Sequence, residues 1–410
     1  MTKNSAISLT APSKESSKTY IVATAFLSLF AIVGIAYYGL PFFFDFMTHD
    51  FHWSRTTVTS GNAFAKLIAG PIFGFIAGWL IDRYGPRRLM LLGSVFMGVA
   101  VAGLGYTGGA LGLFYLFYVF HSLGYVCAGP LPCQVLISRW FDKNRGKAMG
   151  IAYLGIGAGG TIAPLLAEKL ESRYDWHLSL ACLGLLVILI SVPMVLFIRE
   201  RKRKDVPVEK VEQKTEPAVS FKQILTNRNL YLLGLGSMCA IGVVGSMSQH
   251  LKLYLRDLEF SQEQAAHIMS LVLMMSLIGR VLMGWLADLF SRKNVMRLIY
   301  LMVASAIILL LLPHFPGKIY IFAVIYGIGL GGDYMIIPLM AGDLFGVRML
   351  GRIMGIILIV DGIAESSLPM LVGHLYDSSG NYTFSFLLLV CIALTGTVII
   401  SFLPQKAVKS

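Results

Sequence analysis

Runs of about twenty apolar residues recur along this chain, and they constrain its fold more than any other feature. In residues 268–287 nearly every side chain is apolar or small, with Arg280 as the exception. At about 1.5 Å per helical residue, such a run crosses the hydrocarbon core of a bilayer. The chain is 56% hydrophobic and only 14% charged, and its mean hydropathy is +0.72. This composition excludes an ordinary soluble domain and predicts an all-α, polytopic membrane protein.

Twelve spans are predicted, and a charged linker without helical periodicity separates the sixth from the seventh. The spans cover residues 20–43, 57–81, 89–106, 111–136, 147–166, 178–198, 230–255, 268–287, 296–312, 319–344, 353–376 and 384–403. The fourth span contains Gly129 and Pro130 and should bend there. We therefore divide the chain into a tail (1–19), a six-helix half (20–198), a linker (199–228), a second six-helix half (229–404) and a short tail (405–410).

Basic residues are concentrated in the loops on one side of these spans. If both termini lie on that side, it receives Arg83, Arg87, Arg88 and the RERKRK run at residues 199–204, among others. Because cytoplasmic loops are rich in Lys and Arg, both termini are expected to be cytoplasmic. We expect a plasma membrane location, which would be the inner membrane in a bacterium. The net charge of +12 then reflects topology, and no nucleic-acid partner is expected.

An internal repeat relates the two halves. Three pairs of segments recur at offsets of 205 or 206 residues: 78–82 (GWLID) with 284–288 (GWLAD), 146–151 (GKAMGI) with 351–356 (GRIMGI), and Pro164 with Pro369. Parallel repeats of this kind place a substrate site near the bilayer midplane, and the halves rock about it. The repeat therefore predicts a transporter that works by alternating access.

Residues 78–88 (GWLIDRYGPRR) resemble the loop motif of the major facilitator superfamily, and the similarity in layout extends over all twelve helices. An aspartate at such a helix end can hold the basic turn and latch one conformation. The candidate latch residues in the two halves are Asp82, Arg83, Arg87, Asp288 and Arg292. The alternative is a basic loop that serves only to orient the chain in the membrane.

A narrower resemblance is to the monocarboxylate transporters and their bacterial relatives, including oxalate–formate exchangers. It rests on residues 250–288, 139–150 and 373–377. In that family an arginine of the eighth helix binds the substrate carboxylate, and the match falls on Arg280. The oxalate exchangers resemble each other in a lysine of the eleventh helix, where this chain offers Asp361 and Glu365. The departure favours a monocarboxylate moved with a proton over the dianion oxalate.

Arg280 is the first candidate for the substrate site. A guanidinium stays charged at any accessible pH, so at membrane depth it must face a cavity or a partner. Its planar fork can bind a carboxylate through two hydrogen bonds. The alternative is a structural ion pair with an acid on another helix.

The candidates for proton coupling are carboxyl groups and one histidine. His250 and Asp257 flank the outer end of the span 230–255 and share one helix face, and Asp333, Asp361 and Glu365 lie in later spans. A carboxylate near an arginine can take up a proton when the substrate occupies that arginine. Asp257 is alternatively a helix-capping acid, and His250 an ordinary interhelical hydrogen-bond partner. The other three acids are candidates either for the proton site or for a partner of Arg280.

Aromatic and imidazole groups complete the candidate site. Tyr118 and His121 share one face of the span 111–136 and could bind a second substrate oxygen or simply pack against neighbours. Tyr334, next to Asp333, is a further candidate. The five cysteines lie in apolar segments without metal spacing and are interpreted as small core residues. No enzyme signature, cofactor motif or metal motif is present.

These observations predict proton-coupled symport of a small monocarboxylate such as lactate, pyruvate or acetate. The expected partners are a small organic anion, protons and the lipid bilayer, and the functional unit is expected to be a monomer. Two alternatives within the transporter class stay open. The first is exchange of organic anions, and the second is efflux, which usually requires a large apolar cavity without a fixed cation.

Overall fold

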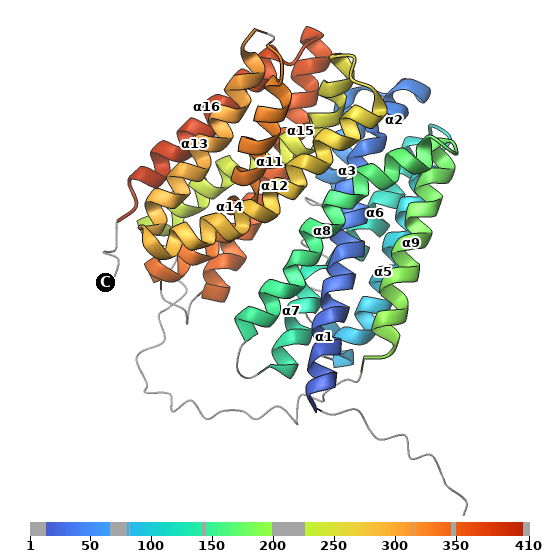
Figure 1. Ribbon diagram of the computed structural model, residues 1–410, viewed down its shortest axis with the longest axis vertical. Coiled ribbons are helices and arrows are strands. Elements are labelled where there is room, and N and C mark those ends of the chain that lie inside the picture. Colours follow the sequence, from blue (N-terminus) through green and yellow to red (C-terminus); the bar gives the residue numbers. More distant parts are fainter. Residues whose placement is uncertain are drawn as a thin grey trace, which may run out of the picture.

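A computed structural model describes residues 14–65, 80–81, 83–141, 145–198, 226–313, 315–345 and 350–404. Within these ranges all regular structure is helical, and the helices run side by side in two groups (Figure 1). Eleven helices of the described part are long and apolar enough to cross a membrane. The predicted all-α membrane architecture is therefore confirmed. Most of the second predicted span, residues 66–79, lies outside the described residues.

The first group contains the helices from α1 to α9. Its members are α1 (Lys14–Leu29), η1 (Phe30–Tyr37), η2 (Leu40–Phe43), α2 (Phe44–Asp50), α3 (Arg55–Phe64), α5 (Pro86–Leu104), α6 (Leu111–Ala128), α7 (Pro130–Trp140), α8 (Arg145–Glu171) and α9 (Trp176–Leu196). The bend predicted at Gly129 and Pro130 is confirmed, because α6 ends at Ala128 and α7 begins at Pro130.

The second group contains six long helices, one for each predicted span. They are α11 (Arg228–Asp257), α12 (Gln262–Leu289), α13 (Arg292–Leu311), α14 (Lys318–Phe345), α15 (Leu350–Ser379) and α16 (Thr383–Ser401). Two of them, α11 and α12, begin at a side-chain cap, provided by Asn227 and Ser261. In α12, for example, the Ser261 hydroxyl accepts from the backbone N–H of Gln264, whose side chain in turn accepts from the N–H of Ser261.

The first span is longer and less regular than predicted. It runs from Lys18 to Asp50 and changes from α-helix to π-helix at Phe30 and to 3-10 helix at Leu40. Pro41 lacks a backbone N–H, which prevents a regular α-helical ladder at this point. In the π-helical stretch Gly34 lies so close to α8 that an added Cβ would be 2.5 Å from Cα of Gly159. The two glycines therefore allow these helices to cross at close range.

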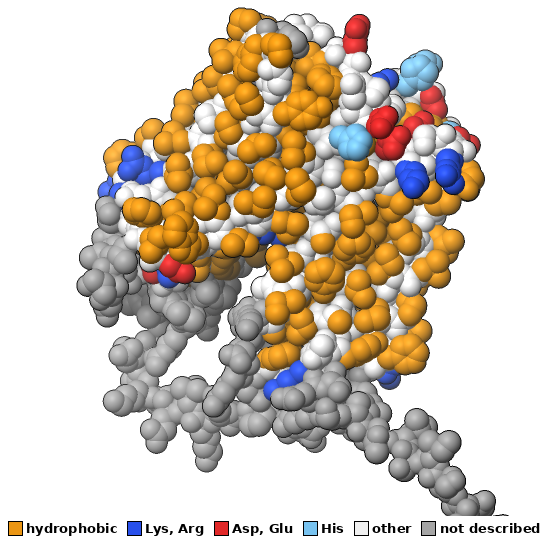
Figure 2. Space-filling model, viewed as in Figure 1, with side chains coloured by type: hydrophobic (Ala, Val, Ile, Leu, Met, Phe, Trp, Pro, Cys, Tyr) orange, Lys and Arg blue, Asp and Glu red, His pale blue; other side chains and the backbone are white. Residues whose placement is uncertain are grey.

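The two groups contact each other along two helix pairs, α8 with α12 and α3 with α15. We define the closed end as the end at which Asp45 pairs with Lys252 and Arg55 pairs with Asp257 across the groups. Away from it the groups diverge and leave a gap that widens toward the end at which α1 begins (Figure 2). We call that end the open end. Apolar side chains cover most of the face shown in Figure 2, as expected for a surface in lipid.

The internal repeat reappears as a repeated contact at the open end. In the first half, the Arg87 guanidinium at the start of α5 donates to the carbonyl of Leu196, the last residue of α9. In the second half, Lys293 at the start of α13 donates to the carbonyl of Leu403, just past α16, at 2.7 Å. A cation at a helix C-terminus satisfies unpaired carbonyls and the helix dipole. In each half, a basic residue at the start of the third predicted span thus caps the C-terminal end of the sixth.

The cysteine prediction needs one correction. Cys127 and Cys133 are buried and Cys182 and Cys239 are partly buried, but Cys391 on α16 is exposed. A membrane protein can place an apolar side chain on its lipid-facing surface at no cost, so an apolar segment does not by itself predict burial.

Candidate functional site

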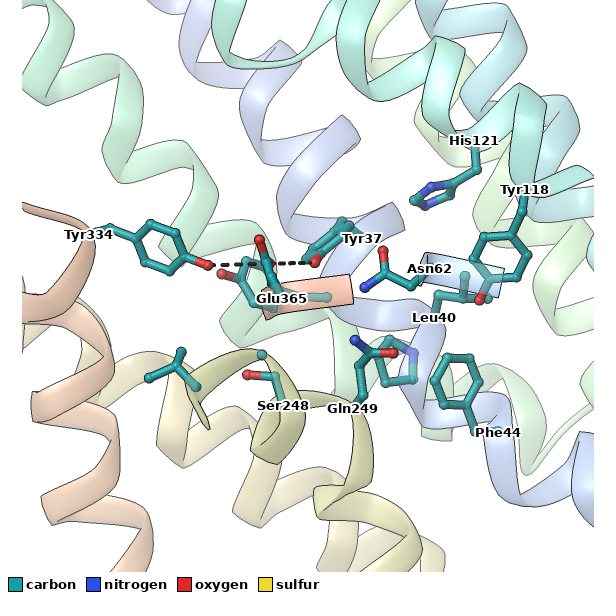
Figure 3. Close-up of a pocket in the computed structure, with 14 residues that line it drawn as sticks. Tyr37, Leu40, Phe44, Asn62, Tyr118, His121, Ser248, Gln249, Tyr334 and Glu365 are labelled. Atoms are coloured by element: carbon teal, nitrogen blue, oxygen red, sulfur yellow. Dashed lines mark hydrogen bonds between the residues drawn. The ribbon is translucent and has the colours of Figure 1, made fainter. Parts of the chain in front are cut away.

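A pocket lies between the two halves, next to the closed end (Figure 3). The first half contributes residues around the break between η1 and α2, together with side chains of α3 and α6. The second half contributes residues of α11, α14 and α15. Its polar lining consists of Tyr37, Tyr38, Asn62, Tyr118, His121, Ser248, Gln249, Tyr334 and Glu365. The pocket therefore lies where a parallel repeat is expected to hold its substrate.

Glu365 joins the two halves inside this pocket. Its Oε1 accepts a hydrogen bond of 3.0 Å from the Tyr37 hydroxyl of the first half and one of 3.3 Å from Tyr334 of the second (Figure 3). Hydrogen bonds to a carboxylate are stronger than those between neutral groups. A change in the charge of Glu365 would therefore change the strength of a contact between the halves.

Two buried polar side chains of the pocket have unused hydrogen-bonding capacity. The amide of Gln249 is 5% exposed, and neither its oxygen nor its nitrogen has a partner among the described residues. The Tyr118 hydroxyl, 1% exposed, has none either. Because buried polar groups are normally hydrogen-bonded, these two indicate a polar ligand. Together they supply an amide donor, an amide acceptor and a hydroxyl.

Aromatic rings make up much of the pocket wall on the first-half side, beside Leu40 and Pro41. The Tyr37 ring lies 5.3 Å from Tyr38, 5.6 Å from Tyr125 and 6.2 Å from the imidazole of His121, measured between centroids. Tyr118 packs on Gly61, where an added Cβ would overlap its ring. The predicted residues Tyr118, His121, Tyr334 and Glu365 are thus brought together in one pocket.

Arg280 lies outside this pocket. Its guanidinium is half-buried and donates to the backbone carbonyl of Tyr153 on α8, at 3.3 Å, across the contact between the halves. At about 1.5 Å per residue, Arg280 lies roughly 13 Å from the open end of α12, and Glu365 lies roughly 22 Å from the open end of α15. Arg280 is therefore nearer the open end than Glu365. Among the described residues it forms no ion pair, and its fork is held only by this carbonyl.

His250 and Asp257 meet in a network at the closed end. Nδ1 of His250 lies 2.9 Å from the Tyr382 hydroxyl, which also accepts from Arg55 at 2.7 Å. Arg55 in turn pairs with Asp257 and lies 3.7 Å from the centre of the Tyr376 ring. Burial raises the pKa of Tyr382 above its ordinary value, so this hydroxyl stays protonated. Neither His250 nor Asp257 lines the pocket.

A second contact at the closed end joins Asp45 of α2 to Lys252 of α11. The ammonium of Lys252 is fully buried, lies 2.7 Å from Oδ1 of Asp45 and also donates to the carbonyl of Phe42. Its nitrogen lies 3.4 Å from the centre of the Phe42 ring. Asp377 of α15 adds a third contact, because its carboxylate accepts from the backbone N–H groups of Arg55 and Thr56 at the start of α3.

The candidate latch residues are distributed differently from the prediction. Asp82 lies outside the described residues, and Arg83 is exposed over the ring of Tyr84. Arg87 caps α9, as described above. In the second half Asp288 is exposed, and Arg292 pairs with Asp343 of α14 at 2.8 Å. Near the end of α14, Arg292 donates both to this carboxylate and to the carbonyl of Leu339. The acidic partner of Arg292 is therefore Asp343 and not Asp288.

Several functional positions did not emerge from the sequence. Tyr37, Asn62 and Gln249 line the pocket, and Asp45 and Arg55 form the closed end. Gln249 offered the best signal, as an amide beside His250 in an otherwise apolar span. Asp45 and Arg55 lay beyond the predicted ends of their spans and looked like ordinary loop charges.

The profile of the Major Facilitator Superfamily matches residues 26–288 and 253–410 of the chain, which together cover most of it. The chain belongs to the Major Facilitator Superfamily. The fold agrees with this, because a bacterial homologue of the human lysosomal transporter Spinster superimposes with a TM-score of 0.77 at 15% identity. That comparison covers 95% of this chain and 97% of the other.

Three curated relatives share 23–25% of their residues with this superfamily member. An uncharacterised MFS-type transporter, YcxA of Bacillus subtilis, is 24% identical over 90% of this chain and 92% of its own length. A fujikurins efflux protein of Gibberella fujikuroi is 25% identical over 82% and 70%. Monocarboxylate transporter 12 of Mus musculus is 23% identical over 95% and 85%. The predicted resemblance to a transporter of the monocarboxylate kind is confirmed, and the protein is a multi-pass membrane transporter rather than an enzyme.

Proposed function

We propose that this transporter carries a small monocarboxylate together with a proton. The observation that carries the proposal is Glu365, a carboxyl group held by one tyrosine from each half inside the pocket between them. A proton on Glu365 removes the negative charge that accepts from both tyrosines, which weakens the contact between the halves. Protonation of Glu365 and the relative position of the halves therefore depend on each other. This dependence is what coupling to a proton gradient requires.

The pocket also supplies groups for a small polar substrate. The unpartnered Gln249 amide and Tyr118 hydroxyl can donate to the oxygens of a carboxylate, and the amide oxygen can accept from a hydroxyl such as that of lactate. Among the described lining residues no lysine or arginine is present. We therefore propose that the substrate enters past Arg280 and that the guanidinium holds its carboxylate on the open side of the pocket.

The remaining parts of the proposal concern orientation and organisation. The open end would face the cytoplasm of a plasma membrane, since both predicted tails and the linker at residues 199–228 carry the excess of basic residues expected there. The halves would comprise residues 20–198 and 229–404 and act as a monomer. The alternative is efflux of a larger compound, which the aromatic wall of the pocket and the similarity to an efflux protein favour.

Uptake of labelled lactate, pyruvate and acetate into proteoliposomes tests the proposal. An inward proton gradient should drive accumulation of at least one of them above its equilibrium level, and a protonophore should remove that accumulation. Exchange that does not depend on the gradient would instead identify an antiporter. Binding of none of the three acids in a thermal-shift screen, together with binding of larger aromatic compounds, would favour efflux.

Arg280→Ala is expected to raise the KM for the transported acid about 10- to 100-fold, because a hydrogen bond to a charged group contributes about 1.5–3 kcal/mol. Arg280→Lys keeps the charge but not the fork, so its KM should lie between those of the wild type and the alanine variant. Arg173→Ala removes an exposed cation and is the matched control. An unchanged KM in Arg280→Ala would exclude this residue from the substrate path.

A further inference from the structure

Four helices of the second half enclose a group of polar side chains that is separate from the pocket. The group consists of Ser237 on α11, Tyr300 on α13, Asp333 on α14 and Asp361 on α15. The first three are fully buried and Asp361 is 4% exposed. We call this group the inner acid cluster. It lies in the interior of a single half, whereas the pocket lies between the halves.

The inner acid cluster contains polar atoms without partners. Both carboxyl oxygens of Asp333 and the hydroxyl of Tyr300 form no hydrogen bond within the described part of the chain. Asp361 accepts a hydrogen bond of 2.7 Å from Ser237. Both carboxyl groups are close enough to act electrostatically on the Tyr300 hydroxyl, and Asp361 acts on Asp333. The unpartnered hydroxyl and carboxyl therefore belong to one site.

No cation of the described residues neutralises this site. Arg280 is the basic residue of α12 nearest to Asp333, since the backbone of α12 at Arg280 packs on Gly331, but its guanidinium donates to Tyr153 on α8. The other titratable groups that interact with the cluster are Glu365 of α15 and Cys239 of α11, and neither carries a positive charge. Two unpaired carboxylates so deeply buried would be very unfavourable, whereas one bound proton removes half of their charge.

The cluster also lies next to the pocket. Asp361 and Glu365 are one helical turn apart on α15 and share a face. Asp333 directly precedes Tyr334, whose hydroxyl donates to Glu365. Asp361 and Tyr334 thus place the cluster within one turn of the group that we propose to take up the transported proton.

We propose that the inner acid cluster is a second proton-binding site, at which Asp333 and Asp361 hold one proton in addition to the proton on Glu365. The inference rests on the proposed function, in which Glu365 is the first such site. Because the two sites are one helical turn apart, the inner acid cluster can keep its proton inside the second half while Glu365 binds and releases a separate proton in the pocket. Tyr300 then serves as a hydrogen-bond partner for the protonated carboxyl.

Infrared difference spectra of the purified full-length protein in detergent, recorded between acidic and alkaline pH, test this without a known substrate. The wild type should show two carboxylic-acid C=O bands that appear on acidification. Glu365→Gln should remove one band and keep the other. Asp333→Asn and Asp361→Asn should each remove the second band and keep the first. Glu263→Gln, at an exposed position of α12, should keep both.

Three outcomes would overturn the second site. One is a spectrum whose acid-induced bands are all unaffected by Asp333→Asn and Asp361→Asn. Another is a cluster band that is present at every pH, which would identify a permanently protonated structural acid. The third is a band that Na⁺ removes at constant pH, which would assign the cluster to a metal cation. A wild-type spectrum in which no acid-induced band is removed by Glu365→Gln would instead contradict the proposed function, so the two failures differ.

A further variant covers the case in which the aspartate variants do not fold. Tyr300→Phe keeps the ring and removes only the unpartnered hydroxyl. It should shift the frequency of the cluster band and leave the Glu365 band in place. An unshifted cluster band would exclude Tyr300 from the site and contradict the proposed arrangement.

Discussion

Glu365→Gln is expected to lower proton-driven accumulation of the transported acid by about tenfold or more. Glutamine keeps the shape of the side chain and an oxygen that can accept from Tyr37 and Tyr334, but it cannot bind and release a proton. The halves should still close around the substrate, because the two tyrosine contacts lose only their charge-assisted part. A tenfold effect corresponds to about 1.4 kcal/mol, which is within the range of a single hydrogen bond to a charged group.

Two measurements separate coupling from binding in this variant. Accumulation of labelled lactate under an inward proton gradient should fall steeply, whereas exchange of external for internal lactate should fall much less. The wild-type rate of accumulation should also rise with the gradient, and the rate of the variant should not. Glu263→Gln is the matched control, since the Glu263 side chain is 72% exposed and its ion-pair partner among the described residues is His267. Accumulation that persists in Glu365→Gln would exclude Glu365 as the coupling group.

Asp45→Asn is expected to shift the protein strongly away from the state that is shut at the closed end. The substitution removes the negative charge that neutralises the fully buried ammonium of Lys252 and leaves it only neutral partners, namely the amide oxygen, a carbonyl and two aromatic rings. Removing one partner of a buried ion pair costs about 3–5 kcal/mol, which is at least a hundredfold change in the ratio of the two states. The cost is relieved when the closed end opens and water reaches Lys252.

Spin labels at the exposed positions His49 and Glu263, on a cysteine-free background, would measure this shift as a distance distribution across the closed end. The double variant Asp45→Asn with Lys252→Met should return toward the wild-type distribution, since this neutral pair of similar volume leaves no buried charge without compensation. Lys318→Met is the control. This lysine is also buried near the closed end, but it donates to carbonyls of its own half. Identical distributions in all variants would contradict a role for the pair in closure.

The sequence predicted the architecture well because it depends on patterns that repeat. Apolar runs, the GWLID and GWLAD segments and the loop charges are each local signals, and together they led to helical spans, a repeat and the superfamily. The pocket depends instead on which helices meet. Tyr37 and Glu365 are 328 residues apart, and Tyr37 ends a π-helical stretch of the first span. No local pattern in the sequence predicts either the helical form or the contact.

Charged residues were the least predictable from the sequence. Lys252 lies near the end of the predicted span 230–255, yet it is fully buried, because Asp45 and the rings of Phe42 and Phe46 enclose it. Arg280 was identified from its own span alone, since its cost in a membrane does not depend on neighbours. Its partner, however, is a backbone carbonyl of Tyr153, and every residue has such a group. An isolated cation can thus be found in a sequence, whereas its partner requires the structure.

The charges at the closed end determine how strongly its opening and closing depend on salt. The first half presents Asp45 and Arg55 at these contacts, and the second half presents Lys252, Arg256, Asp257 and Asp377. Among the residues of these contacts, acids and bases are equal in number on each side, so the contacts add no net charge to either separated face. If one face were acidic and the other basic, each would bind counterions when the end opens, and these counterions would have to be released before the end could close. Here the charges of these contacts balance on each side, so their re-formation should depend only weakly on ionic strength.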